Sequence, residues 1–250
     1  AGNDDPTLAR RVAGADLMRV RHQTRLLPPA AVNEALAERI ELFKSRSQRD
    51  PSRKEKRELK EDTYAALLPK AFLKSDRIFG LYLRGEKLLV VDTTSDVQAE
   101  LFMDQLRNAF GSLEATPLAF KKPVAELLQQ VFLGKGPDDF NAARECRMQD
   151  PGNGGSTVSW MDMDLADAQV RRHVQTGLAI DRLGMHFDGS LGLVLDCDAV
   201  IRKYKYLAQD TVDDLPDEEP LAKLDAEIAM LAGSLTALCR ALKKHQGGYA

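Results

Sequence analysis

The chain has 250 residues, of which 44% are hydrophobic and 29% are charged, and its formal net charge is -3. This length can bury a substantial core, as one large domain or two smaller ones. No run approaches the roughly 20 apolar residues that a membrane-spanning helix needs, so we expect a cytoplasmic protein without membrane contact. The cysteines, Cys146, Cys197 and Cys239, are far apart, and the four histidines lack ligand-pair spacing, so neither disulfides nor a bound metal are expected.

The charge is distributed unevenly along the chain. Residues 44–77 contain eleven Lys or Arg against six Asp or Glu, whereas residues 210–227 contain eight acids and only Lys223 as a base. Because salt screens charges beyond roughly 8 Å, a basic segment can attract phosphates even within an acidic protein. The alternative is an ordinary solvated helix surface, which charge alone favours.

Two helices are predicted in the first third of the chain. Residues 16–21 alternate as a half-buried strand does, and apolar residues then recur at helical spacing from Ala30. Pro51 ends this helix, and Ser52 with Glu55 is a candidate capping box for a second helix that reaches about Leu68. The first turns of the second helix have few apolar residues, so we expect their cations to be exposed.

The next segment predicts a hairpin, helices and a connection. Residues 78–83 and 87–92 read as strands around a tight turn. Residues 95–110 and 123–133 have helical periodicity, and residues 113–118 are predicted as a short strand between these helices. The polar residues 137–155 are predicted as a flexible connection and a subdomain boundary.

The last hundred residues predict a second set of strands and helices. Strands are expected at 157–161, 178–187 and 190–196, and helices at 166–176 and 221–244. The acidic segment 210–219 is predicted as a loop. The run Lys203-Tyr204-Lys205-Tyr206 alternates cations with aromatic rings, a pattern that could stack on the bases of single strands.

Catalytic motifs are lacking. The sequence has no GxGxxG, no GxxxxGK[ST] and no GxSxG motif, so we expect no catalytic residues, no metal site and no cofactor. The one enzymatic alternative is a magnesium-dependent nuclease, since Asp162, Asp164 and Asp167, or Asp196 and Asp198, could supply oxygen ligands. Helix capping and strand-end exposure also account for these aspartates.

Several short motifs occur in a defined order over about ninety residues. They are Leu26-Leu27-Pro28, Ala35-Leu36 with Ile40, Leu67-Leu68-Pro69-Lys70-Ala71-Phe72, Val91-Asp92, and Gly111-Ser112-Leu113 with Pro117-Leu118. This arrangement resembles the bacterial recombination-associated RdgC family, and weaker similarity extends through residues 178–196 and the C-terminal helix. The family has an N-terminal segment of several dozen residues without a counterpart here. That difference and the absence of Met at the start favour a truncated or processed chain.

The resemblance implies a fold. We expect an α+β fold with antiparallel or mixed sheets, packed helices and a protruding helical arm, in a ring-forming dimer. Residues 1–27 and 93–150 would form a central region, residues 28–92 the arm with a basic tip and a hairpin, and residues 151–250 a C-terminal region ending in a long amphipathic helix.

The resemblance also implies a function. It is that of a nucleoid-associated homodimer that binds double- and single-stranded DNA without sequence preference and limits access of RecA. Alternatives are a magnesium-dependent exonuclease, a label that the family has carried, and a structural interaction module that binds no DNA.

Specific residues follow from the charge pattern and the resemblance. Phe72 is expected to anchor the dimer, with core packing against the following strand as the alternative. Residues 158–165 contain acids where the family has cations. The expected DNA contacts are Arg53, Lys54, Lys56, Arg57, Lys60, Lys70, Lys74 and Arg77.

Overall fold

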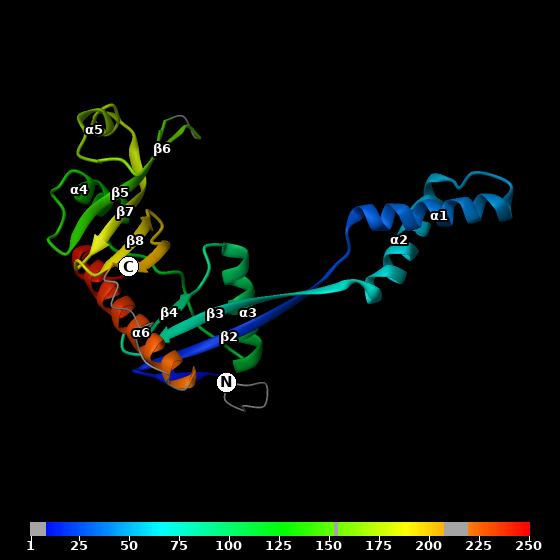
Figure 1. Cartoon of the computed structure of the whole chain (residues 1–250), viewed down its shortest axis with the longest axis horizontal. Helices are drawn as coiled ribbons and strands as arrows, with labels where there is room; N and C mark the ends of the chain where they lie inside the picture. The colour runs from blue at the N-terminus through cyan, green and yellow to red at the C-terminus, as the bar shows by residue number, and fades with distance from the viewer. Residues whose placement is uncertain (1–8, 153–154, 208–219) are drawn as a thin grey trace. The chain divides into compact units, whose positions relative to one another are not determined.

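The computed structural model describes residues 9–152, 155–207 and 220–250, and it has the α+β fold that the sequence predicts (Figure 1). One sheet has four strands in the order β1-β2-β3-β4, and the other has five in the order β6-β5-β7-β8-β9. The strands of the first sheet are β1 (Arg10–Val12), β2 (Ala15–Leu26), β3 (Phe72–Leu83) and β4 (Leu88–Val91). The β1–β2 and β3–β4 ladders are antiparallel, as are all ladders given for the second sheet.

The chain divides into two compact units. One is Arg19–Ile78, and the other combines residues 1–18 with Phe79–Ala250. The predicted arm, by comparison, covered residues 28–92. The ring-forming dimer stays a prediction.

The Arg19–Ile78 unit consists of residues 19–26 of β2, residues 72–78 of β3 and the helices between them. These are α1 (Pro29–Ser47), α2 (Arg53–Leu67) and the short 3-10 turn η1 (Leu68–Lys70) (Figure 1). The α1 helix ends at Gln48, whose backbone is left-handed with φ 54°. The capping box that begins α2 is confirmed, because the Ser52 side chain accepts from the Glu55 N–H and the Glu55 carboxylate accepts from the Ser52 N–H.

The α1 and α2 helices pack on each other through a thin core. Val32 is the fully buried residue of α1 and Thr63 that of α2, where the Thr63 hydroxyl donates to the Leu59 carbonyl. Such a small core stabilises a helix pair weakly. Helix capping at Ser52 is therefore a comparatively large contribution to the stability of this helix pair.

The other unit has two cores joined by one helix. The first half of α6 (Pro220–His245) packs on the four-stranded sheet through Ile228, Ala232 and Leu235, and its second half packs on the five-stranded sheet. Against β3 lies α3 (Asp96–Phe110), whose Phe102 ring occupies the space that a side chain at Gly80 would fill.

The five-stranded sheet has one apolar face. Leu183 of β7, Leu193 of β8 and Leu238 of α6 belong to its core, together with residues of α4. The alternation of side chains along a strand sends the other set of residues to the opposite face, which is polar. Its elements are α4 (Val124–Phe132), β5 (Phe140–Gln149), β6 (Thr157–Met161), α5 (Ala168–Gln175), β7 (Ala179–Phe187), β8 (Leu191–Asp196) and β9 (Ile201–Tyr206).

The structure confirms most predicted elements and corrects two. The segment 137–155, predicted as a connection, contains β5, which pairs with both β6 and β7. The segment 113–118 contains no strand. The acidic segment 210–219 lies outside the described residues. Among the helices that are described, none has the length and apolar character required to cross a membrane.

Candidate functional site

The α2 helix presents a basic face. Arg53, Lys56, Arg57 and Lys60 recur at intervals of three and four residues, so they lie on one side of the helix over about 10 Å of its length. All four are exposed. Tyr64, 47% exposed, continues the same side one turn further. The structure thus brings four of the eight predicted DNA-binding residues onto one surface, which we call the α2 basic face.

The acids of α2 compete little with this face. Glu58 and Asp62 lie on the opposite side of the helix by the same periodicity. Arg57 approaches Glu61 at 3.7 Å, and both side chains are at least 70% exposed. Exposed pairs of this kind contribute 0–1 kcal/mol at most. A phosphate can therefore displace the carboxylate at little cost.

The turn before α2 is fixed by Arg49. Its guanidinium donates to both oxygens of Glu55, at 2.6 and 2.9 Å, and lies 5.3 Å from the centroid of the Phe43 ring on α1. The hydrogen bonds from Arg49, and then from Ser52, hold the pKa of Glu55 well below its usual range. Glu55 is thus ionised and held at the start of the helix, where its negative charge interacts favourably with the positive end of the helix dipole.

The other predicted contacts do not join the α2 basic face. Lys54 lies about 100° around the helix from Arg53 and approaches Glu58 at 4.0 Å. Lys70 is exposed in the η1 turn. Lys74 and Arg77 are exposed on β3, but they are three positions apart, so they point to opposite sides of the strand.

Phe72 begins β3 and is 86% exposed, while its neighbour Leu73 is 57% exposed. Packing of Phe72 in the core of its own chain, the alternative to a dimer contact, is therefore wrong. Arg25 on β2 fixes the preceding turn by donating to the carbonyls of Leu68 and Pro69, at 3.3 and 2.7 Å. A large apolar side chain is thus held in solvent at a defined position.

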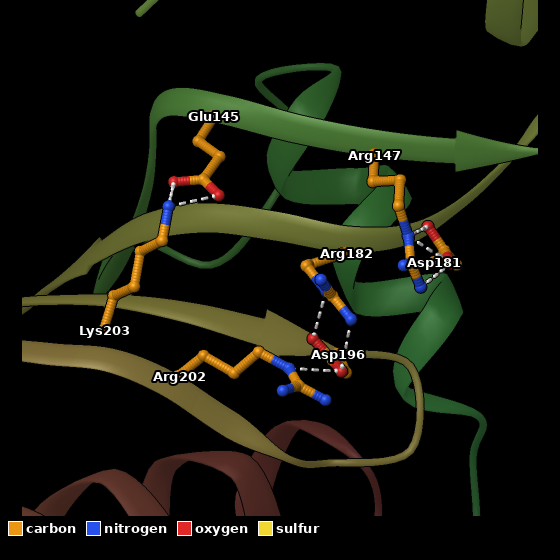
Figure 2. Close-up of polar contacts among 7 residues, drawn as sticks. All are labelled: Glu145, Arg147, Asp181, Arg182, Asp196, Arg202 and Lys203. Atoms are coloured by element: carbon orange, nitrogen blue, oxygen red, sulfur yellow. Dashed lines mark hydrogen bonds and ion pairs between the residues drawn. The ribbon is translucent and has the colours of Figure 1, made fainter. Parts of the chain in front are cut away.

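The polar face of the five-stranded sheet carries a set of ion pairs (Figure 2). Asp196, at the end of β8, accepts from Arg182 at 2.8 Å and from Arg202 at 2.8 Å. On the same sheet, Lys203 of β9 donates to both carboxylate oxygens of Glu145 on β5, at 2.7 and 2.6 Å. A third pair, Arg147 with Asp181, joins β5 to β7. Of these groups, the sequence singled out Lys203, as part of the run Lys203-Tyr204-Lys205-Tyr206 considered for single strands, and Asp196, as a possible magnesium ligand.

Four of the five aspartates considered for magnesium, all except Asp198, have other partners. Asp196 binds the two arginines just described, and Asp162 accepts from Arg144 at 2.7 Å. Asp164 accepts from the Ala166 N–H, and Asp167 caps α5 by accepting from the Gln169 N–H. Within residues 9–152, 155–207 and 220–250, no group of three His, Cys, Asp or Glu side chains is arranged to hold a metal ion.

The thiols and the β9 tyrosines are also structural. Burial raises the pKa of Cys146 to about 12 and that of Cys239 to about 11, so both are protonated at neutral pH. The hydroxyls of Tyr204 and Tyr206 bind Ser234 of α6, at 2.6 and 2.9 Å, and their rings pack on the core. The prediction that these rings could stack on bases is therefore wrong.

Comparisons with known proteins give a consistent result. A family model described as "Putative exonuclease, RdgC" matches residues 1–249. The recombination-associated protein RdgC of Shewanella sp. strain MR-4 is 32% identical over 250 residues, which is 99% of this chain and 82% of the relative. The proteins of the same name from Shewanella piezotolerans and Shewanella oneidensis are each 31% identical with the same coverage.

Proposed function

The chain belongs to the RdgC family of recombination-associated proteins, and we propose that it binds DNA through the phosphate backbone without reading the base sequence. The α2 basic face is the observation that carries the proposal. Its four cations are exposed and lie side by side on one helix, and none of them is buried in the small core of that helix. Flexible cations on a helix surface can follow phosphates, which carry no sequence information.

Double and single strands can both use such a face. Phosphates are common to the two, and attraction to them falls with added salt in both cases. Tyr64 adds an exposed ring next to Lys60, where an unstacked base can pack on it. The proposal therefore includes both DNA forms.

We propose that the protein acts by occupying DNA and not by cutting it. Asp162, Asp164, Asp167 and Asp196, four of the five aspartates considered for magnesium, are engaged with arginines or with backbone N–H groups. DNA covered in this way is less accessible to a recombinase such as RecA. We propose that this coverage is its role in recombination and that it keeps the protein on the nucleoid, without any catalytic step.

A second copy of the chain is the proposed partner of Phe72. A phenylalanine that is 86% exposed and adjoins Leu73 favours burial in an interface, where aromatic anchors contribute much of the binding energy. Phe72→Asp should convert a dimer to a monomer in light scattering while the far-ultraviolet circular dichroism spectrum remains that of the unchanged protein. A variant that remains dimeric would show that the two chains meet elsewhere.

The proposed DNA contact is tested by three charge removals on α2. In the variant Lys56→Gln, Arg57→Gln, Lys60→Gln, the helix former Gln keeps the helix while three cations are lost. If each cation neutralises one duplex phosphate, affinity at 0.1 M salt should fall by up to about 500-fold, equally for unrelated sequences.

The matched control removes three exposed cations from the other unit. Lys87→Gln, Arg107→Gln and Lys135→Gln give the same change in net charge, and these side chains are exposed on β-turn, α3 and loop positions. The control should bind within a fewfold of the unchanged protein. Equal losses in the two triple variants would indicate a general charge effect and would contradict the assignment to α2.

A further inference from the structure

The polar face of the five-stranded sheet contains a bulge that gathers cations on β9. Val194 pairs with Arg202 and Gly192 pairs with Lys205, so Lys203 and Tyr204 together oppose the single residue between them. Lys203 takes a left-handed backbone conformation with φ 51°. This is the pattern of a β-bulge, which redirects side chains from strict alternation. Because of this bulge, the side chains of Arg202, Lys203 and Lys205 all lie on the polar face.

The three cations differ in how firmly they are held. Arg202 binds Asp196, whose side chain is 9% exposed, so this pair is part of the sheet. Lys205 is exposed, and among the described residues no ion pair to it is found. Lys203 is held less firmly than Arg202 and more firmly than Lys205. Its pair with Glu145 is bidentate, but the Lys203 and Glu145 side chains remain 55% and 27% exposed. An exposed pair contributes 0–1 kcal/mol, so it exchanges readily with a competing anion.

Two glycines keep the surface open for these long side chains. A Cβ at Gly184 would lie 3.1 Å from the Cβ of Glu145, and one at Gly192 would lie 3.1 Å from the Cε of Lys205. Figure 2 shows Lys203 extending over the sheet towards Glu145, and β7 and β8 lie between the strands of the two residues. Side chains at the glycines would obstruct this path.

We propose that Lys203 and Lys205 form a second phosphate-binding surface, in which Glu145 competes with the nucleic-acid phosphate for Lys203. The inference rests on the proposed DNA binding and adds a surface that is separate from the α2 basic face. Lys205 contacts phosphate directly. Lys203 is not available to phosphate while it is paired with Glu145. The carboxylate of Glu145 therefore lowers the affinity of the whole protein for DNA.

Glu145→Gln tests the competition. Glutamine keeps the size and the acceptor but removes the charge, so Lys203 becomes available to one more phosphate. The salt dependence of duplex binding, as log affinity against log salt, should steepen by about 0.9, and affinity at 0.1 M salt should rise by up to about eightfold. Asp104→Asn is the matched control, since Asp104 is an exposed carboxylate paired with Arg107 at 2.8 Å on α3. Its effect should stay below about twofold, because Asp104 pairs with Arg107 and with neither Lys203 nor Lys205.

A double-mutant cycle identifies Lys203 as the group released. Lys203→Gln should change affinity little in the unchanged protein and should abolish the gain in the Glu145→Gln background. A gain that persists without Lys203 would overturn the competition with Glu145. Lys205→Gln should lower affinity and reduce the salt slope by about 0.9; an unchanged slope would remove Lys205 from the surface.

The outcomes separate this inference from the proposed function. Unchanged protein that binds duplex in a salt-dependent way, with no response to Glu145→Gln, would overturn the second surface alone. Unchanged protein that does not bind DNA would overturn both. Thermal unfolding of each variant shows whether its fold is retained, and all of these side chains lie at the surface of the sheet, where glutamine is tolerated.

Discussion

Gly80 is the position where a single methyl group should be most informative about the fold. A Cβ built there would lie 2.3 Å from Cζ and 2.6 Å from Cε1 of Phe102, whose side chain is 0% exposed. The ring must move by about 1.1 Å to restore an ordinary contact of 3.4 Å. Because Phe102 is enclosed in the core between α3 and β3, neither the ring nor the strand can move freely.

The magnitude follows from two opposing terms. Overpacking of a core costs about 1–3 kcal/mol, whereas replacing Gly by Ala at a compatible backbone position stabilises by about 0.4–1 kcal/mol through the unfolded chain. Gly80 is not among the residues with positive φ, so the backbone accepts alanine. We therefore expect Gly80→Ala to lower the free energy of unfolding by about 1–2 kcal/mol.

Urea unfolding followed by far-ultraviolet circular dichroism measures this difference. Gly85→Ala is the control, because nothing lies within 4 Å of a Cβ there, and it should be neutral or slightly stabilising. In the Phe102→Leu background, where the ring is gone, Gly80→Ala should cost much less. If Gly80→Ala is as stable as Gly85→Ala, or if its cost is the same with leucine at position 102, the packing of α3 on β3 is wrong.

Three further predictions concern the caps and ion pairs. Ser52→Ala removes one acceptor of the capping box and should destabilise the start of α2 by about 1 kcal/mol, seen as faster amide hydrogen exchange at Glu55 and not in α6. Arg49 and Ser52 hold the pKa of Glu55 below its unfolded value of about 4.3, so the stability that Glu55 contributes is present above pH 4.3 and is lost as the pH falls towards the folded pKa. The start of α2 should therefore fray in acid, and Glu55→Gln should not show this pH dependence. Equal acid-induced fraying in both proteins would contradict the role of the Arg49–Glu55 pair. Asp196→Asn leaves Arg182 and Arg202 without their shared carboxylate and should cost about 2 kcal/mol in urea unfolding, whereas the exposed Asp162→Asn should cost below about 1 kcal/mol.

Local signals explain what the sequence predicted well. Ser52 and Glu55 are three residues apart and bind each other's backbone, and Gly111 follows α3 with a φ of 78° that suits glycine. These features depend on neighbours in the chain, so they can be found without the fold. The basic face of α2 is of the same kind, since helical spacing alone places Arg53 and Lys60 together.

Partners far apart in the sequence explain what was missed. The β5 strand carries the charged residues Glu145 and Arg147, so its sequence resembles that of a loop. Their partners, Lys203 and Asp181, are distant in sequence and are brought to them by the sheet. The basic side of β9 depends on a bulge, which shifts the alternation that a strand pattern assumes. The sequence therefore suggested the whole run Lys203-Tyr204-Lys205-Tyr206 for nucleic acid, whereas in the structure its lysines are exposed and its tyrosines pack on the core.

The most direct test of the account is the affinity of the unchanged chain for duplex DNA across a range of salt concentrations, with two duplexes of unrelated sequence. If the four cations of the α2 basic face each neutralise one phosphate, a plot of log affinity against log salt should fall with a slope of about -3.6 or steeper. The two duplexes should give the same line. An affinity that does not change with salt, or that is lost when the sequence of the duplex is changed, would contradict binding through the phosphate backbone.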